Sequence, residues 1–157
     1  MSKQVTISGT TYTLNQQGDS PPWGEDLSSL LEALVEVANS VVGTGDILTT
    51  SFSVANNISS ATNITGLVFD PAQIRSAIIS YSVYRSTNST ELSEAGQIMV
   101  TYKSTANSWE LARYSVGDAG LTFTMLPSGQ MQFTSTNMSG TGYSGLLKFN
   151  AKAFTQT

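Results

Sequence analysis

The sequence predicts a mainly β protein: an antiparallel β-sandwich, jelly-roll-like and of about eight strands, preceded by an N-terminal β-arm and one amphipathic helix. Three observations support this fold class. Apolar and polar residues alternate over many short segments after residue 47, which is the period of half-buried strands. Turn-forming residues separate these segments. A single segment near the start has the periodicity of a helix instead. An immunoglobulin-like sandwich is the alternative topology. The chain has no cysteine and so lacks the Cys and Trp pattern of antibody domains, but that pattern is not obligatory for the fold.

Residues 1–24 are expected to form an attachment arm. Apolar side chains alternate around a Ser8-Gly9 turn signal, at Val5, Ile7, Tyr12 and Leu14. This pattern predicts a short hairpin or an extended arm. Two short strands are marginal alone, so we expect them to lie on another surface. Pro21 and Pro22 then restrict the chain before Trp23.

Residues 25–43 are expected to form an oligomerisation helix, with Asp26 as its N-cap and Gly43 at its end. Its main apolar stripe has the 3-4 spacing of a heptad seam and consists of Leu27, Leu30, Leu34, Val37 and Val41. A flank of Leu31, Val35, Ala38 and Val42 widens it. The helix either lies across its own sandwich or pairs with copies of itself, and the flank suits both. An isolated helix this short is marginal in water, so self-association would need help from the β-domains.

Residues 47–157 are expected to form the sandwich. The predicted strands are 47–55, 63–69, 76–85, 96–103, 108–116, 120–126, 130–135 and 143–154. Inward positions include Ala77, Ile79, Tyr81, Val83, Ile98, Val100, Tyr102, Leu121, Phe123, Met125, Leu147, Phe149 and Ala151. Pro127 to Gly129 is predicted to close a tight hairpin. Asp70 is predicted to cap one helical turn.

The side-chain inventory argues against catalysis. The chain has no histidine and no cysteine, so the usual proton-transfer and nucleophilic machinery is missing. Glu91 and Glu94 are expected in a solvated loop before a strand. Asp118 sits in "VGDAG", where a calcium ion and a simple Gly-rich turn are the alternatives. We therefore expect no enzyme activity and no cofactor.

The charge pattern bears on partners. The net charge is −4, from 7 basic and 11 acidic residues. Residues 1–46 carry six acids and one base, and residues 47–157 carry five acids and six bases. The absence of a basic stripe argues against nucleic-acid binding. The absence of a long apolar run argues against a membrane span, and the N-terminus lacks the pattern of a secretory signal.

Two loops are candidates for ligand contact. Residues 86–95 and the Gly-Ser-Thr-rich segment 135–145 hold the receptor-loop candidates Asn88, Glu91, Asn137 and Tyr143. A ligand-binding loop with an aromatic platform and a wide inter-strand loop are the two interpretations of the second segment.

The stretches "PPWGEDLSSLLEALVEVAN", "YRSTNSTELSEAG" and "TSTNMSGTGYSG" carry a resemblance to a known group. Nearly the whole chain resembles small tailed-bacteriophage virion structural proteins of the head-decoration (cement) or head-fibre type. These have an N-terminal attachment segment and a C-terminal β-sandwich. The resemblance implies a structural role with no catalytic residues.

The resulting hypothesis is a capsid decoration protein on the outer surface of the phage head, assembled in the host cytoplasm. It is expected to be a homotrimer that binds the major capsid protein or another virion protein, although Leu and Val at the seam do not decide between dimer and trimer. The capsid-anchoring candidates are Val5, Ile7, Tyr12 and Trp23. Trp23 either enters a partner's pocket or covers the start of its own helix.

The alternative hypothesis is a tail-fibre or receptor-binding tip that contacts a host glycan or protein. A cell-encoded carbohydrate-binding module is a third, and no cluster of exposed aromatics supports it.

Overall fold

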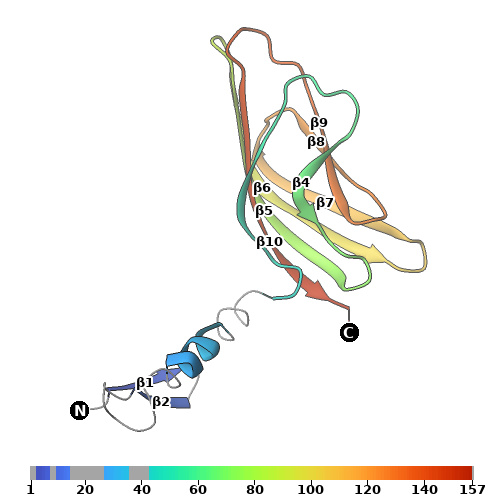
Figure 1. Cartoon of the computed structure of the whole chain (residues 1–157). Helices are drawn as coiled ribbons and strands as arrows, with labels where there is room; N and C mark the ends of the chain where they lie inside the picture. Colours follow the sequence, from blue (N-terminus) through green and yellow to red (C-terminus); the bar gives the residue numbers. More distant parts are fainter. Residues whose placement is uncertain (1–2, 8–9, 15–26, 36–42, 157) are drawn as a thin grey trace. The chain divides into compact units, whose positions relative to one another are not determined.

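The computed structural model describes residues 3–7, 10–14, 27–35 and 43–156 (Figure 1). The chain divides into two compact units, residues 1–43 and residues 44–157, and each is described by itself. Among the described residues, no helix is both long enough and apolar enough to span a membrane.

The first unit contains a β-hairpin and a helix. Strands β1 (Lys3–Ile7) and β2 (Thr10–Leu14) pair antiparallel, with Val5 opposite Tyr12. Residues 27–35 are helical, inside the predicted range of 25–43. Alternating β-branched and aromatic residues favour the strands, and the leucine spacing favours the helix. Three candidates, Trp23, Val37 and Val41, lie outside the described residues.

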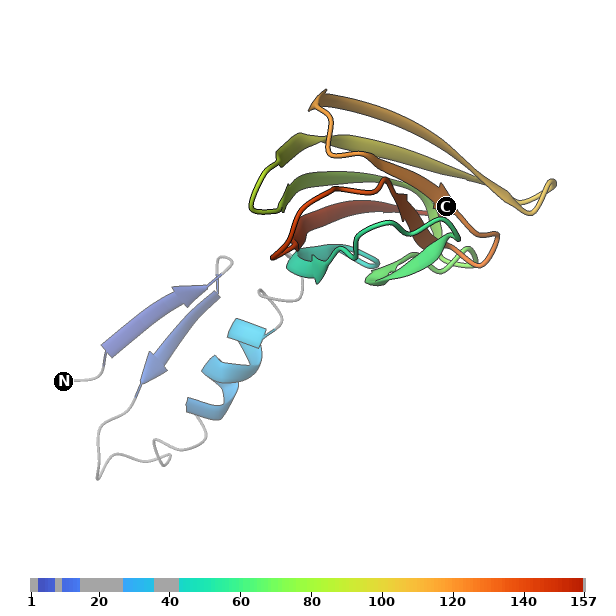
Figure 2. The ribbon, with the colours of Figure 1, turned by 90° about the horizontal axis from the view of Figure 1, so that it is seen from above.

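The second unit is an antiparallel β-sandwich, which confirms the predicted fold class. The larger sheet has the order β3-β10-β5-β6-β7, and the smaller sheet has the order β4-β9-β8 (Figures 1 and 2). The strands are β3 (Ile47–Ser53), β4 (Thr62–Val68), β5 (Ile74–Ser86), β6 (Glu91–Lys103), β7 (Ser108–Gly117), β8 (Leu121–Met125), β9 (Gln130–Ser135) and β10 (Ser144–Thr155).

Strand pairing joins the two ends of the sandwich sequence. The first strand, β3, pairs with the last, β10, and β4 pairs with β9. By contrast, β5, β6 and β7 form a meander within one sheet, so the sheets contain five and three strands.

The core lies between the two sheets and follows the predicted alternation. Buried residues of the larger sheet include Ala77, Ile79, Val83, Ile98, Val100, Leu147 and Phe149, and those of the smaller sheet include Ile64, Leu67, Leu121, Phe123, Met131 and Phe133. Aromatic pairs join the layers: the ring centroids of Tyr81 and Phe123 are 5.3 Å apart, and those of Phe52 and Phe133 are 5.5 Å apart. Such edge-on pairs add to the energy of burial.

Two predicted turns are confirmed. The Leu126–Gly129 turn closes the β8–β9 hairpin, with Gly129 N–H donating to the Leu126 carbonyl at 2.9 Å. Gly129 has φ +83°, and a Cβ there would lie 1.7 Å from the Phe69 carbonyl oxygen, so the turn requires glycine. Asp70 accepts from the Ala72 N–H at 2.8 Å and caps a single turn before β5.

The start of β6 corrects the sequence prediction. We expected a strand from residue 96 and a solvated loop holding Glu91 and Glu94. The strand instead begins at Glu91, and Glu94 is a buried residue within it. The prediction was wrong because "ELSEAG" lacks alternating apolar residues. Its first three residues are strand nonetheless, because they pair with "YRS" of β5, which extends the sheet to Ser86.

Candidate functional site

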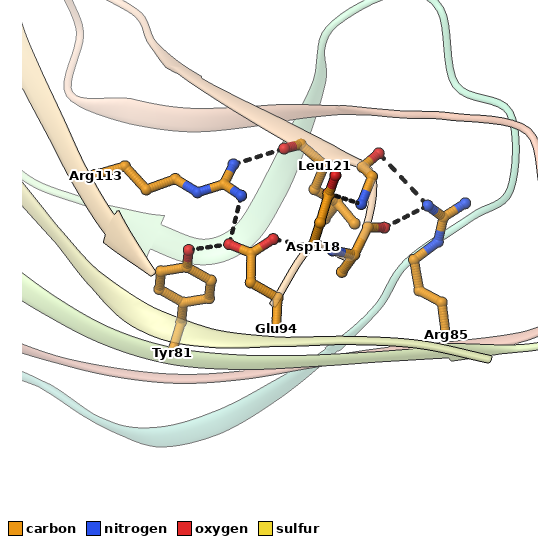
Figure 3. A network of polar contacts seen from close by, with 8 residues as sticks. Tyr81, Arg85, Glu94, Arg113, Asp118 and Leu121 are labelled. Atoms are coloured by element: carbon orange, nitrogen blue, oxygen red, sulfur yellow. Dashed lines mark hydrogen bonds and ion pairs between the residues drawn. The ribbon is translucent and has the colours of Figure 1, made fainter. Parts of the chain in front are cut away.

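A network of polar side chains lies inside the sandwich (Figure 3). Its centre is formed by Arg85 on β5 and Glu94 on β6, whose exposed fractions are 0% and 3%. Side chains two residues apart on a strand point to the same face of the sheet. Arg85 therefore faces inward with Tyr81 and Val83, and Glu94 faces inward with Ile98 and Val100. Buried charges are costly unless they are paired and hydrogen-bonded, so their partners decide what they do.

Glu94 is held by three groups. One carboxylate oxygen forms an ion pair with the Arg113 guanidinium at 2.5 Å and accepts a hydrogen bond from the Tyr81 hydroxyl. The other accepts from the Ala119 N–H at 3.0 Å. Burial, with a further contribution from the bond to Glu94, raises the pKa of Tyr81 to about 12. The network is internally satisfied, which is the arrangement of a structural cluster.

Arg85 binds carbonyl and amide oxygens of the surrounding loops. It donates to the backbone oxygens of Ala119 and Thr136, each at 2.6 Å, and to Asn56 Oδ1 at 3.1 Å. Its Nε donates to the Tyr143 hydroxyl at 3.0 Å. Arg85 therefore ties together three loops that are far apart in the sequence, and together with Glu94 it holds both the C=O and the N–H of Ala119.

The two predicted receptor loops meet at one end of the sandwich. Asn88 N–H donates to the Thr141 carbonyl at 2.9 Å, and Thr141 N–H donates back to Asn88 Oδ1 at 2.9 Å. Asn88 and Asn137 are exposed at this end, and so is Glu91, the first residue of β6. We call this surface, residues 56, 87–91 and 136–143, the loop end.

Tyr143 has a different environment from its three companions. It is half-buried, and its hydroxyl donates to the Val54 carbonyl at 2.9 Å while it accepts from Arg85. These bonds anchor the segment 135–145 to the body of the sandwich.

Asp118 lies in the turn that leads from β7 to β8. Its Oδ1 accepts from the Gly120 N–H at 2.7 Å, and Gly117 and Gly120 have φ values of +83° and +65°. This is the geometry of a Gly-rich turn with an Asp side chain closing it. Among the described residues, no group of three or more acidic side chains gathers in a way that would hold a metal ion.

The helix of the first unit has an exposed apolar face. Leu27, Leu31, Leu34 and Val35 are 39%, 53%, 46% and 58% exposed, whereas Leu30 is buried at 9%. The exposed residues follow the spacing i, i+4, i+7 and i+8, which places them on one side of a helix. This face shares Leu27 and Leu34 with the predicted seam. Leu30 is covered by the chain's own residues, and Leu31 and Val35, predicted as flank, lie in the open.

The sequence interpretation missed Arg85 and Glu94 as interior residues. Their strand register was a usable signal, because both positions have the same parity as the predicted inward residues. Charged side chains are rarely fully buried, so Arg and Glu are normally expected at the surface even where the strand register points them inward.

Comparison with known proteins gives one weak likeness. Neither a family model nor a curated protein sequence matches this chain. A tailspike protein of the Acinetobacter phage vB_ApiP_P1 has a structural match with a TM-score of 0.41 and 13% sequence identity. The match covers 68% of this chain and 22% of the tailspike chain. A likeness at this level defines neither the fold nor the function. The described fold itself places the chain among two-layer antiparallel β-sandwich proteins with a separate helix-bearing N-terminal unit.

Proposed function

We propose that this chain is a non-enzymatic structural protein of a tailed-phage virion, a capsid decoration protein that binds the outer head surface as a homotrimer. The observation that carries the proposal is the exposed apolar helix face formed by Leu27, Leu31, Leu34 and Val35. The biological setting is the expectation drawn from the sequence stretches quoted above, which no family model and no curated protein sequence matches.

The helix face supports self-association. Full burial of one Leu or Val side chain contributes about 1.5–3 kcal/mol, so four such residues on each of three helices provide a substantial driving force. The four side chains cover little more than two helical turns, which fits a short bundle. Such a short bundle is marginal alone, so contacts between the β-domains are part of the proposal.

The β1–β2 hairpin supports an attachment role for the arm. Among the described residues no third strand joins this sheet. The outer edge of a strand can add a strand of another protein by backbone hydrogen bonding. In this proposal the partner is the major capsid protein or another virion protein, and Val5, Ile7, Tyr12 and Trp23 are the anchoring candidates.

A specific observation favours the second candidate function, a tail-fibre or receptor-binding tip. The loops that hold Asn88 and Asn137 converge at the loop end and are fixed there by Arg85 and by bonds to each other. Preorganised loops of this kind are suited to recognition, because less ordering is needed on binding. The ligand in this case would be a host-surface glycan or protein.

Two experiments test the proposal. In the first experiment, gold-labelled antibody against the chain is viewed on intact particles by electron microscopy and is expected to decorate heads. Decoration of tails would support the second candidate function, and unlabelled particles would refute both functions.

In the second experiment, particles that lack the protein are mixed with the full chain or with residues 25–157. The shortened chain is expected to remain oligomeric and to lose particle binding. Retained binding would show that the arm is not the anchor.

A further inference from the structure

Strand β7 forms one edge of the larger sheet (Figure 2). Among the described residues, no strand joins the side of β7 that faces away from β6. Natural sheets usually protect such an edge with bulges, short strands, prolines or lysines, because an open edge can pair with another chain. The β7 segment lacks these features. It pairs with β6 along its whole length without a register shift, and it contains neither proline nor lysine.

The other described edges of the sandwich are irregular or short. The pairing of β3 with β10 and that of β4 with β9 both contain register shifts, and Gly66 of β4 has φ +83°. Strand β8 has only 5 residues, and Pro127 follows closely after it. Bulges and short strands of this kind resist pairing with another chain. Among the described strands of the sandwich, β7 is thus the long and regular edge.

The end of β7 also exposes apolar side chains. Tyr114 and Val116 are 64% and 83% exposed. They lie on the outer face of the larger sheet, because Arg113 between them and the previous turn of the alternation points to the inner face, where it pairs with buried Glu94. Residues 114–117 carry no charged side chain. This end of the edge therefore combines strand-forming residues with an uncharged surface.

We propose that β7 pairs with β7 of a second copy of this chain, antiparallel and about a two-fold axis at Ser115. In this register, Tyr114 of each copy lies opposite Val116 of the other copy, and Arg113 lies opposite Gly117. Two aromatic to β-branched pairs then stabilise the contact. Backbone groups at the outer side of both strands gain hydrogen bonds, as in other cases of strand addition.

The charges favour this register over the two neighbouring ones. An axis at Arg113 would set the two Arg113 side chains opposite each other. An axis at Tyr114 would set Glu110 of one copy opposite Asp118 of the other. Like charges directly opposite each other destabilise a strand pair. The axis at Ser115 avoids both juxtapositions, so the sequence of this edge is compatible with its own copy.

The contact is weak on its own. Only residues 113–117 of each chain pair, so the buried area stays well below the roughly 1,200 Å² of a stable interface. Dilute solution therefore leaves the edge unpaired, and pairing becomes populated where copies are concentrated or held close together. A two-fold contact joins two chains whatever holds the helices together. The inference therefore does not depend on the proposed trimer, or on whether the protein sits on the head or on the tail.

Single-cysteine variants of the full chain test the pairing, because the chain has no cysteine of its own. Ser115→Cys sets two thiols opposite each other with Cα atoms about 4.5–5.5 Å apart, a distance that a disulfide spans. With oxidised glutathione at high chain concentration, this variant should form a disulfide-linked dimer about tenfold faster than Ser53→Cys, because pairing raises the effective concentration of the thiols. Ser53 is the matched control, an exposed serine on β3 at the opposite edge of the same sheet. Denaturing gels without reductant measure the dimer.

A second substitution separates strand pairing from random collision. Val116→Lys in the Ser115→Cys chain should abolish the acceleration, because a lysine on the edge blocks pairing. Val68→Lys is its control: Val68 is 50% exposed on the irregular β4 edge, and crosslinking should stay fast. In the wild-type chain, hydrogen exchange at residues 113–117 should slow as the concentration rises, whereas exchange in β3 should not.

The remaining outcomes contradict the inference. If Ser115→Cys crosslinks no faster than Ser53→Cys, or if exchange at residues 113–117 is independent of concentration, the edge does not pair with its own copy and is left to a strand of another protein. Fast crosslinking that survives Val116→Lys would mean that collision joins the thiols, which also refutes strand pairing.

Discussion

At the scale of single residues, Glu94 shows how this sandwich keeps charges in its interior. A buried carboxylate is tolerated because Arg113, Tyr81 and the Ala119 N–H all contact it. We expect Glu94→Gln to lower the free energy of unfolding by about 3 kcal/mol, since the Arg113 guanidinium, which is 26% exposed, would lose its only recorded acidic partner. Urea unfolding of the purified chain measures the change.

The control for this variant lies on the neighbouring strand. Glu110 pairs with Lys103 at 2.5 Å, and both side chains are more than half exposed. Glu110→Gln should therefore cost less than about 1 kcal/mol, as expected for a surface ion pair. Similar losses for the two variants would contradict the structural role assigned to the buried network.

Tyr81 predicts how the stability depends on alkaline pH. Its pKa is about 12 in the folded protein, against 10.0 for an ordinary tyrosine, because burial and the bond to Glu94 favour the neutral phenol. The stability that Tyr81 contributes is complete below pH 10.0 and is lost as the pH rises from 10.0 towards about 12. Tyr81→Phe should make the fall in unfolding free energy over this window shallower. An unchanged slope in urea titrations at several alkaline pH values would exclude this linkage.

Individual residues also show where sequence interpretation succeeds. The inward parity of Ile79, Tyr81 and Val83 was predictable because apolar alternation on a strand reports directly on burial. Arg85 continues the same parity, but its burial depends on oxygens of distant loops. No pattern within β5 reveals those oxygens.

At the scale of elements, the long β5 strand joins the hydrophobic core to the loop end. Its last inward residue, Arg85, holds the loops at Asn56, Ala119 and Thr136. Arg85→Met should destabilise the protein by about 3 kcal/mol or more, because several buried acceptors would lose their donors. Hydrogen exchange should also rise at residues 119–120 and 136–143 more than in the β8–β9 hairpin.

Arg75→Lys serves as the control for this prediction. Arg75 also donates to a carbonyl oxygen, that of Tyr102, but it lies on the exposed side of the same strand. The Arg75→Lys variant should change neither the free energy of unfolding nor the hydrogen exchange of the loop end appreciably. A uniform increase in exchange across the sandwich with Arg85→Met would mean that Arg85 stabilises the fold as a whole and does not specifically fix the loop end.

The elements also differ in how well the sequence predicts them. Strands with regular alternation, such as β8 and β10, were placed within a few residues. The first five residues of β6 were missed because Glu91, Ser93 and Glu94 carry no strand signal, and the pairing of this segment with β5 is a long-range contact. The helix was predicted from its leucines, whereas the burial of Leu30 depends on tertiary structure.

At the scale of the whole molecule, the chain combines two compact units with different chemistry. Residues 44–157 bury a continuous core, and the helix of residues 1–43 leaves four large apolar side chains exposed on one side. An exposed apolar face on a small helix is commonly an interaction surface. We therefore propose that the first unit carries the stable self-association and that the second carries recognition surfaces.

Sedimentation equilibrium of the full chain tests this central claim most directly. The account predicts a wild-type mass three times the 16.7 kDa of the chain. The double variant Leu31→Asp, Leu34→Asp should sediment as a monomer with an unchanged β-sheet circular dichroism spectrum, and Glu32→Gln, which lies outside the exposed apolar face, should stay trimeric. A monomeric wild type, or a double variant that keeps the wild-type mass, would contradict the account.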